Sequence, residues 1–209
     1  MKLECITVNY RTEDLTLRVV RALSAALEGL DAQITVVDNG SGEAAPERLR
    51  EGLQALGGST PTSLLVSDRN GGFGAGNNLA IRAALRRPDP PDVFYLINPD
   101  ALPDPGAISA LLGFLERHPR VGIAGTGVRD LQGPHSSAFR FPTPPGELEG
   151  RLRLGAASRL LARWRIPLEP GGAARRVDWV SGSSCALRRS MLEEVGLFDE
   201  SFFLYFEET

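Results

Sequence analysis

Cysteine is scarce in this 209-residue sequence, which contains only two. Cys5 and Cys185 each lie in an apolar, strand-like segment, and neither stands at the spacing of a metal-ligand motif. A cysteine in such a segment usually packs as a small apolar side chain. We therefore expect both residues in the core and neither in catalysis.

Long apolar runs are also lacking. None approaches the roughly 20 residues that a helix needs to cross a bilayer. The sequence opens directly with a strand pattern at residues 3–8, without the apolar core of a signal peptide. These absences predict a cytoplasmic protein.

An excess of positive charge is missing too, because 23 basic residues stand against 26 acidic ones and give a net charge of −3. Proteins that hold nucleic acid by its phosphates need a basic surface. We therefore expect no nucleic-acid partner. The hydrophobic content of 42% is enough for one main core.

Strand and helix patterns alternate along most of the chain. Short β-branched or apolar runs predict strands at residues 3–8, 34–37, 64–66, 93–97, 121–124 and 177–180. Apolar residues at helical spacing predict helices at 13–27, 46–56, 79–85, 105–115 and 189–195. Thr12 is the expected N-cap of the first helix. The alternation predicts an α/β fold, layered around a mostly parallel central sheet.

Asp100 follows the strand 93–97, directly after Pro99. Ligands of open α/β sheets bind at the carboxyl ends of the strands, where a carboxylate can hold a divalent cation and, through it, phosphate oxygens. An aspartate after a proline is also a common turn residue. The spacing alone leaves both interpretations open.

A glycine-rich stretch, residues 70–78, precedes the predicted helix 79–85. Its glycines, Gly72, Gly74 and Gly76, alternate and so depart from the G-x-G-x-x-G pattern, which disfavours an NAD-dependent enzyme. The glycines allow the backbone to approach a ligand closely at a helix N-terminus, where free N–H groups favour anions. The alternative is a flexible turn.

Residues 151–165 combine one apolar helical face, which includes Trp164, with surrounding arginines. Such a segment can make peripheral contact with an anionic membrane, but more often it is a helix packed on the core. At the end of the sequence, Glu207 and Glu208 follow an aromatic run. A partly desolvated carboxylate there has a raised pKa and can act as a base. The alternative is an exposed acidic terminus.

Five segments together resemble one family: ITVNYRTEDL, ITVVDNGSGE, NGGFGAGNNLAIRAA, LINPDALPDPGAI and the run from VDWVSGSS to FEET. The sequence resembles the inverting nucleotide-sugar glycosyltransferases of family two, which have the GT-A fold, and in particular their bacterial rhamnosyltransferase-like branch. The resemblance implies a single domain over residues 1–209. Its nucleotide-sugar-binding half would be 1–125 and its acceptor-side half 126–209, shortened at the end relative to the family.

The resemblance also implies a set of residues that bind the nucleotide sugar. They are Asn9, Tyr10, Arg11, Asp38, Asn70, Gly72, Phe73, Asn77, Asn98 and Asp100. Asp100 takes the last position of the family's Asp-x-Asp metal motif, in which Asn98 replaces the first aspartate. A divalent cation, Mg²⁺ or Mn²⁺, is therefore expected at Asp100 with one carboxylate fewer than usual.

The remaining expectations concern the reaction. Glu208 is the first choice for the general base and Glu207 the second, by their resemblance to the family's acidic motif. Trp179 offers a flat face for an acceptor sugar, or is a core residue. The expected donor is dTDP-rhamnose or a UDP-sugar, and the acceptor a glycan or lipid-linked glycan at the inner face of the membrane. The alternative function is a nucleotide-sugar-binding domain with little or no turnover, since the acceptor region is short.

Overall fold

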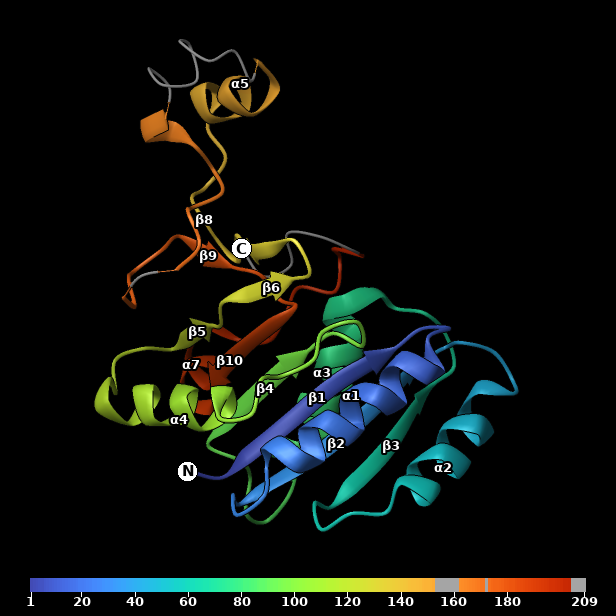
Figure 1. Ribbon diagram of the computed structural model, residues 1–209. Coiled ribbons are helices and arrows are strands. Elements are labelled where there is room, and N and C mark those ends of the chain that lie inside the picture. Colours follow the sequence, from blue (N-terminus) through green and yellow to red (C-terminus); the bar gives the residue numbers. More distant parts are fainter. Residues whose placement is uncertain (153–161, 172, 204–209) are drawn as a thin grey trace. The chain divides into compact units, whose positions relative to one another are not determined.

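The computed structural model describes residues 1–152, 162–171 and 173–203 (Figure 1). It divides into two compact units. The first contains residues 1–124 and the described residues from 182 onward, and the second lies within residues 125–181. The chain leaves the first unit after Ala124 and returns to it at Gly182.

The first unit alternates strands and helices before it receives the returning chain. Its elements are β1 (Leu3–Asn9), α1 (Glu13–Ala26), β2 (Ala32–Asn39), α2 (Ala45–Leu56), β3 (Thr62–Ser67), α3 (Gly72–Leu85), β4 (Val93–Ile97), α4 (Ala107–Arg117), β5 (Ile123–Gly125), β10 (Ser184–Arg188) and α7 (Arg189–Val195).

One six-stranded sheet, in the order β3-β2-β1-β4-β10-β5, forms the centre of this unit. β1 pairs in parallel with both β2 and β4, and β2 pairs in parallel with β3. β10 runs antiparallel to β4, with Ser184 opposite Ile97. The prediction of an α/β fold with a mostly parallel central sheet is confirmed.

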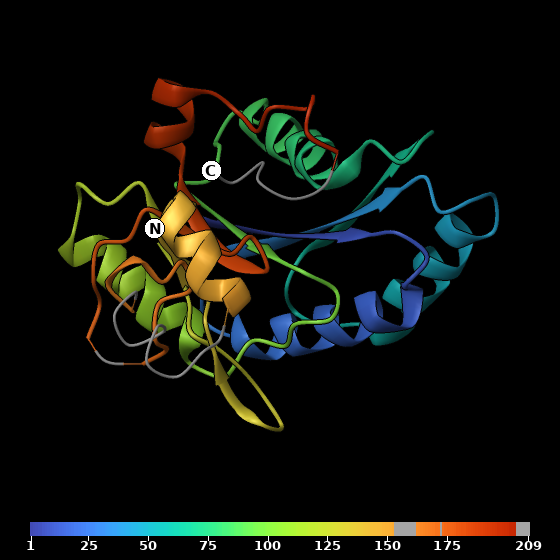
Figure 2. The ribbon, with the colours of Figure 1, turned by 90° about the horizontal axis from the view of Figure 1, so that it is seen from above.

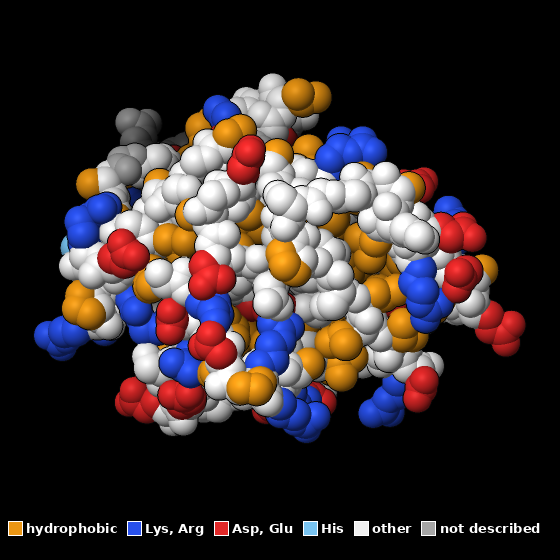
Figure 3. Space-filling view, turned by 90° about the horizontal axis from the view of Figure 1, so that it is seen from below, with side chains coloured by type: hydrophobic (Ala, Val, Ile, Leu, Met, Phe, Trp, Pro, Cys, Tyr) orange, Lys and Arg blue, Asp and Glu red, His pale blue; other side chains and the backbone are white. Residues whose placement is uncertain are grey.

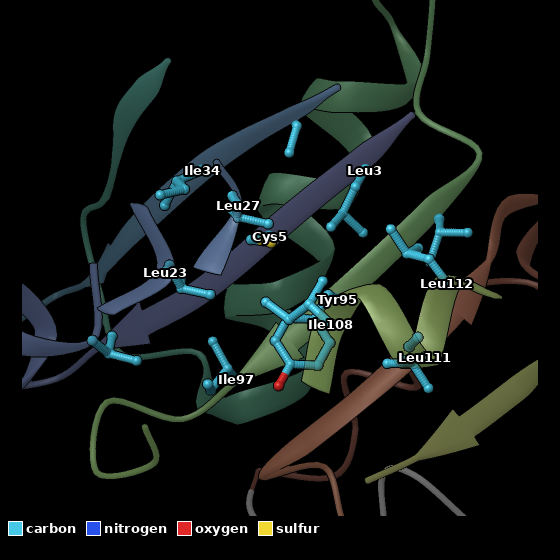
Figure 4. Packing of buried hydrophobic residues seen from close by; sticks show 14 of the residues in the cluster. Leu3, Cys5, Leu23, Leu27, Ile34, Tyr95, Ile97, Ile108, Leu111 and Leu112 are labelled. Carbon is cyan, nitrogen blue, oxygen red and sulfur yellow. The ribbon is translucent and has the colours of Figure 1, made fainter. Parts of the chain in front are cut away.

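Helices cover both faces of the sheet, and α1 and α2 lie on the opposite face from α3 (Figure 2). Side chains alternate between the faces of a strand, which decides what each residue contacts. Leu3 and Cys5 of β1 pack with Leu23 of α1 and with Ile108 and Leu111 of α4 in one apolar cluster (Figure 4). Burying a leucine or isoleucine side chain is worth about 1.5–3 kcal/mol, so this cluster is a main source of stability.

Both cysteines are buried and free, as expected. The strand 93–97 and the helix 189–195 have the predicted bounds. β10 was not among the predicted strands, although its Cys185 was placed in a strand-like segment. The first helix begins where expected, with Thr12 at its N-cap position, but the Thr12 side chain makes no capping hydrogen bond to it.

The second unit contains two pairs of short strands among its described residues. β6 (Val128–Asp130) pairs with β7 (Gly133–His135), and β8 (Ala138–Phe139) pairs with β9 (Trp179–Val180), both antiparallel. α5 (Pro144–Leu152) and the short 3₁₀ helix η1 (Ala162–Trp164) complete its described elements. Of the basic segment 151–165, residues 153–161 lie outside the described residues.

Acidic and basic side chains are interspersed on the face of the molecule drawn in Figure 3, in line with the nearly balanced composition. Within the described ranges, no helix combines the length and the apolar character that crossing a bilayer requires.

Candidate functional site

Polar side chains gather where the parallel strands of the first unit end. β1 ends at Asn9, β2 at Asp38 and Asn39, and β4 is followed by Asn98 and Asp100. Because parallel strands end at the same edge, these residues come from distant parts of the sequence to one place. The expectation that Asp100 lies just beyond this edge is met.

A cavity of about 410 Å³ opens at this edge. The described residues that line it are Val8, Tyr10, Thr12, Leu15, Asn39, Asn70, Gly72, Phe73, Asn98, Pro99, Asp100 and Phe203. Six of the predicted binding residues are in this lining: Tyr10, Asn70, Gly72, Phe73, Asn98 and Asp100. Aromatic rings, amides and one carboxylate therefore face the same space, which suits a ligand with a flat ring and a charged group.

A second hollow, of about 310 Å³, lies between α2 and the residues leading into β3. Its described lining, from Val20 and Leu53 to Thr62, includes no ionisable side chain. The polar cavity at the strand ends is therefore the candidate site.

Asn9 and Asp38 lie buried beside the cavity and are joined by hydrogen bonds. Asn9 Nδ2 donates to Asp38 Oδ1 over 2.8 Å and to Ser41 Oγ over 3.0 Å. Asn9 Oδ1 accepts from the hydroxyl of Thr16 in α1, over 2.9 Å, and from the backbone N–H and hydroxyl of Thr12. Both Asn9 and Asp38 are almost fully buried, so their described contacts fix the loops after β1 and β2.

The loop after β1 presents Tyr10 to the cavity. Tyr10 is 40% exposed, and the Arg11 guanidinium carbon lies 5.2 Å from the centre of its ring. Arg11 itself has φ +58°, a left-handed conformation that is uncommon for a side-chain-bearing residue. Its backbone N–H donates to Ser41 Oγ over 2.9 Å, which ties this loop to the loop after β2.

The loop before α3 is held by Asn39 and Asn70. Asn39 Nδ2 donates to Asn70 Oδ1 and to Gly72 O, each over 2.9 Å. Asn39 Oδ1 accepts from Gly71 N–H, and Asn70 Oδ1 accepts from Gly72 N–H. These amides therefore shape the cavity wall between β2 and α3.

Three N–H groups at the start of α3, those of Gly71, Gly72 and Phe73, are bonded within the chain and are not free for an anion. Besides Gly71 and Gly72, whose partners are given above, Phe73 N–H donates to Phe203 O over 3.2 Å. Gly72 has φ +88°, and a Cβ there would lie only 2.0 Å from Phe203 O. The close backbone approach that glycine allows is thus made by the chain's own Phe203 carbonyl.

Asn77 and Gly76 serve the packing of α3. Asn77 is buried, and its Nδ2 donates to Phe73 O, one turn earlier in the same helix. A Cβ at Gly76 would lie 2.7 Å from a methyl group of Val8 in β1. α3 begins at Gly72 instead of Leu79 because these glycines permit close packing against the sheet, which outweighs their low helix propensity.

Asp100 is exposed at the mouth of the cavity, in a turn closed by a 3.0 Å hydrogen bond from Ala101 N–H to Asn98 O. Asn98 N–H donates to Ser183 O, also over 3.0 Å, so the turn is anchored to the residue before β10. Within the described part of the chain, no hydrogen bond or ion pair involves the Asp100 carboxylate. It is therefore available for a cation or a ligand.

The described residues contain no group of three or more potential metal-binding side chains of His, Cys, Asp or Glu. A divalent cation bound at Asp100 would consequently take most of its ligands from phosphate oxygens and water, as Mg²⁺ commonly does. The oxygen donors of Asp100 and Asn98 fit a hard cation of this kind.

Glu207 and Glu208 lie outside the described residues. Trp179 belongs to the second unit, where its indole stacks on Phe139 with a centroid distance of 4.1 Å. Its Nε1–H donates to Arg140 O over 3.1 Å. These contacts join β8 to β9 and suit the second of the two roles that the sequence left open, that of a packed side chain.

Asn39, Asn78 and Phe203 were missed by sequence reasoning. Asn39 adjoins the predicted Asp38, but side chains alternate along a strand. Asp38 therefore faces the α1 side, and Asn39 the α3 side, where it reaches the glycine-rich loop. That alternation was a usable signal, whereas the contacts of Asn78 and Phe203 depend on pairings across more than 100 residues.

The pKa of Glu200 is lowered from its usual 4.5, first by a hydrogen bond from Asn78 and then by one from Arg82. A carboxylate with a lowered pKa in the folded state stabilises the fold above its unfolded pKa. We expect this contribution to be present above about pH 4.5 and to be lost as the pH falls through the lower, folded value.

The measurement is the urea concentration at the midpoint of unfolding, determined at intervals of about one pH unit between pH 3 and pH 7. Glu200→Gln should show a smaller loss of stability below pH 4.5 than the unchanged protein. Identical pH profiles for the two proteins would contradict the expectation.

The fold and the cavity define a class of protein: an α/β domain that binds a ligand beyond the carboxyl ends of its parallel strands. Residues 4–196 match the family model described as glycosyl transferase family 2. The chain therefore belongs to glycosyl transferase family 2, as the resemblance predicted.

Two curated relatives match nearly the whole chain. The N-acetylglucosaminyl-diphospho-decaprenol L-rhamnosyltransferase of Mycobacterium tuberculosis is 31% identical over 223 residues, covering 99% of this chain and 67% of the relative. The low-salt glycan biosynthesis hexosyltransferase Agl10 of Haloferax volcanii is 28% identical, with coverage of 99% and 59%. The chain thus spans about two thirds or less of the length of these relatives.

Two solved structures of similar fold have low sequence identity to this chain. The mannosyltransferase PcManGT from Pyrobaculum calidifontis, in complex with GDP-Man and Mn²⁺, has a TM-score of 0.62 at 17% identity, covering 95% of this chain and 48% of that one. Staphylococcus aureus TarS 1–349, in complex with UDP, has a TM-score of 0.59 at 14% identity, covering 100% and 53%. The expected GT-A fold is confirmed by these similarities.

Proposed function

We propose that this chain binds a nucleoside-diphosphate sugar in the cavity at the strand ends and transfers the sugar, with inversion, to a hydroxyl of a glycan or lipid-linked acceptor. The observation that carries the proposal is the common lining of the cavity by the Tyr10 ring, the amides of Asn39 and Asn70, and the Asp100 carboxylate. Family membership supports glycosyl transfer.

The aromatic and amide residues suit the nucleoside. Tyr10, 40% exposed and at the cavity wall, offers a face on which a base can stack. Asn70 and Phe73 line the opposite loop. Asn9 and Asp38 would not contact the nucleoside directly. Their hydrogen bonds fix the loop that carries Tyr10 and Arg11. Arg11, which lies against the Tyr10 ring, and Asn77, which bonds Phe73 O, would likewise support the residues that bind the nucleoside.

Asp100 and Asn98 would hold the divalent cation, Mg²⁺ or Mn²⁺. When bound, the cation would supply positive charge that neutralises the departing diphosphate. The exposed, unpaired carboxylate at the cavity mouth supports this assignment. So does the mannosyltransferase neighbour, whose structure holds GDP-Man together with Mn²⁺.

The transfer itself needs a base. The acceptor hydroxyl attacks the anomeric carbon from the face opposite the diphosphate, so the new C–O bond forms as the old one breaks and the configuration inverts. Glu208, or failing that Glu207, would take the hydroxyl proton; both lie outside the described residues. A positioned carboxylate base is worth about 10²–10⁴-fold in rate.

For the donor we propose dTDP-rhamnose, with UDP-sugars as the alternative. The mycobacterial relative is named as an L-rhamnosyltransferase that acts on a lipid-linked N-acetylglucosaminyl diphosphate. TarS, by contrast, was solved with UDP. A lipid-linked acceptor would place the protein at the cytoplasmic face of the membrane, with peripheral contact through residues 151–165.

Titration calorimetry with dTDP, UDP and GDP, each with and without Mn²⁺, tests the shared binding step. We expect one of them to bind at least about tenfold more tightly when Mn²⁺ is present, because the cation bridges Asp100 and the diphosphate. AMP, which lacks the diphosphate, is the control. Failure of all three diphosphates to bind would overturn the proposed function.

Turnover separates transfer from simple binding. With dTDP-rhamnose as donor and a short-chain lipid-linked N-acetylglucosaminyl diphosphate as acceptor, we expect release of dTDP that depends on the acceptor. Tight binding of the diphosphate without such release, for UDP-sugar donors as well, would favour the alternative of a binding domain without turnover.

A further inference from the structure

Residues 198–203, here called the arm, follow α7 and lie along α3. The side chain of Asn78 in α3 is fully buried and bonds the backbone of Phe198, the first residue of the arm. Asn78 Nδ2 donates to Phe198 O over 2.8 Å, and Phe198 N–H donates to Asn78 Oδ1 over 3.1 Å. One amide thus satisfies both backbone groups of a single residue 120 positions away.

The same amide also reaches an ion pair. Asn78 Nδ2 donates to Glu200 Oε1 over 2.9 Å, and Arg82 lies 2.7 Å from the same oxygen. Asn78 and Arg82 are four residues apart, so they stand on one face of α3. This face therefore binds the arm by its backbone and by its carboxylate.

The far end of the arm is fixed to the start of α3. Phe73 contacts Phe198 edge to face, with ring centroids 6.0 Å apart, and its backbone N–H donates to Phe203 O. Phe73 and Phe203 both line the cavity at the strand ends. The arm consequently contributes Phe203 to the wall of the cavity, and Asn78, Arg82 and Phe73 together hold it along α3.

We propose that Asn78 is a positioning residue for the nucleotide sugar: it holds the arm so that Phe203 closes one side of the donor cavity. This inference rests on the proposed function. Asn78 does not line the cavity among the described residues, so it acts through the arm. If its amide is removed, the Phe198 N–H and C=O lose their buried partners, and exposing them to water requires the arm to leave α3.

The test compares Asn78→Ala with Leu49→Ala in the full chain. Leu49 is fully buried in α2, on the opposite face of the sheet, so its replacement lowers stability without touching the arm. For each protein we would measure thermal stability, hydrogen exchange of residues 198–203, and the Kd of dTDP and UDP with Mn²⁺.

Asn78→Ala is expected to abolish the protection of residues 198–203 and to raise the Kd by about tenfold. Leu49→Ala should lower thermal stability comparably, with the Kd changed by less than about twofold. An equal loss of affinity in both variants would show that Asn78 acts only through stability, which contradicts a positioning role. An unchanged Kd in Asn78→Ala, beside normal binding by the unchanged protein, would overturn this inference alone.

Glu200→Ala provides a second variant that keeps the buried amide. Glu200 is 42% exposed, so its removal leaves the fold intact and weakens only one of the arm's attachments. We expect partial loss of protection in the arm and a Kd raised by about two- to threefold. Full protection together with full affinity would contradict the proposal. Absence of nucleotide binding in the unchanged protein would instead refute the proposed function.

Discussion

Glu208→Gln is expected to lower the rate of sugar transfer by about 10²–10⁴-fold, because a glutamine amide cannot accept the proton of the acceptor hydroxyl. The affinity for the nucleoside diphosphate should not change, since the base acts on the acceptor and not on the donor. The measurement is acceptor-dependent release of dTDP under steady state, beside calorimetric titration of dTDP with Mn²⁺. Such a split places the loss in the transition state.

Glu207→Gln is the matched control, one residue earlier in the same acidic pair. It should keep most of the activity if Glu208 is the base. Loss of activity in Glu207→Gln with activity retained in Glu208→Gln would exchange the two roles. Full activity in both variants would show that neither carboxylate accepts the proton.

Asp100→Asn is expected to remove the Mn²⁺-dependent part of nucleoside-diphosphate binding and to lower kcat/KM by about 10²-fold. The substitution keeps the shape of the side chain but removes its charge, and within the described residues the carboxylate has no protein partner that would be disturbed. The fold should therefore be unaffected. The measurement is the titration with and without Mn²⁺, followed by transfer assays over a range of Mn²⁺ concentrations.

Asp104→Asn is the control for this variant, because Asp104 is also exposed and follows β4 but does not line the cavity among the described residues. It should bind and turn over like the unchanged protein. If Asp100→Asn kept its full response to Mn²⁺, the proposed cation site would be wrong.

The sequence predicted those parts of the fold that local patterns determine. β4 is a β-branched and aromatic run between prolines, and α7 ends at a glycine, so both were found with their observed bounds. No strand was assigned at β10, although the segment around Cys185 looked strand-like, because its residues, Ser-Cys-Ala-Leu-Arg, carry a weak strand signal. Its pairing with β4 is set by a contact about 90 residues apart in sequence.

The candidate site was predictable to a similar extent. The segments that meet at the strand ends were identified, since their polar residues directly follow apolar strands. The individual partners were less accessible to prediction. Three of the N–H groups expected to be free at the start of α3 are bonded instead to two asparagine side chains and to Phe203 O. Such occupancy depends on tertiary packing, which periodicity does not report.

The chain connects the central sheet to the second unit through two neighbouring strands. The chain departs after β5 and re-enters at β10, which lies next to β5. Arg188 N–H, at the end of β10, donates to Gly122 O, just before β5, over 2.8 Å. The sheet therefore holds both ends of residues 125–181 close together. Because the entropic cost of closing a loop rises only slowly with its length, a segment of another length adds little to this cost. A different segment can therefore be inserted there while the cavity at the strand ends keeps its described walls.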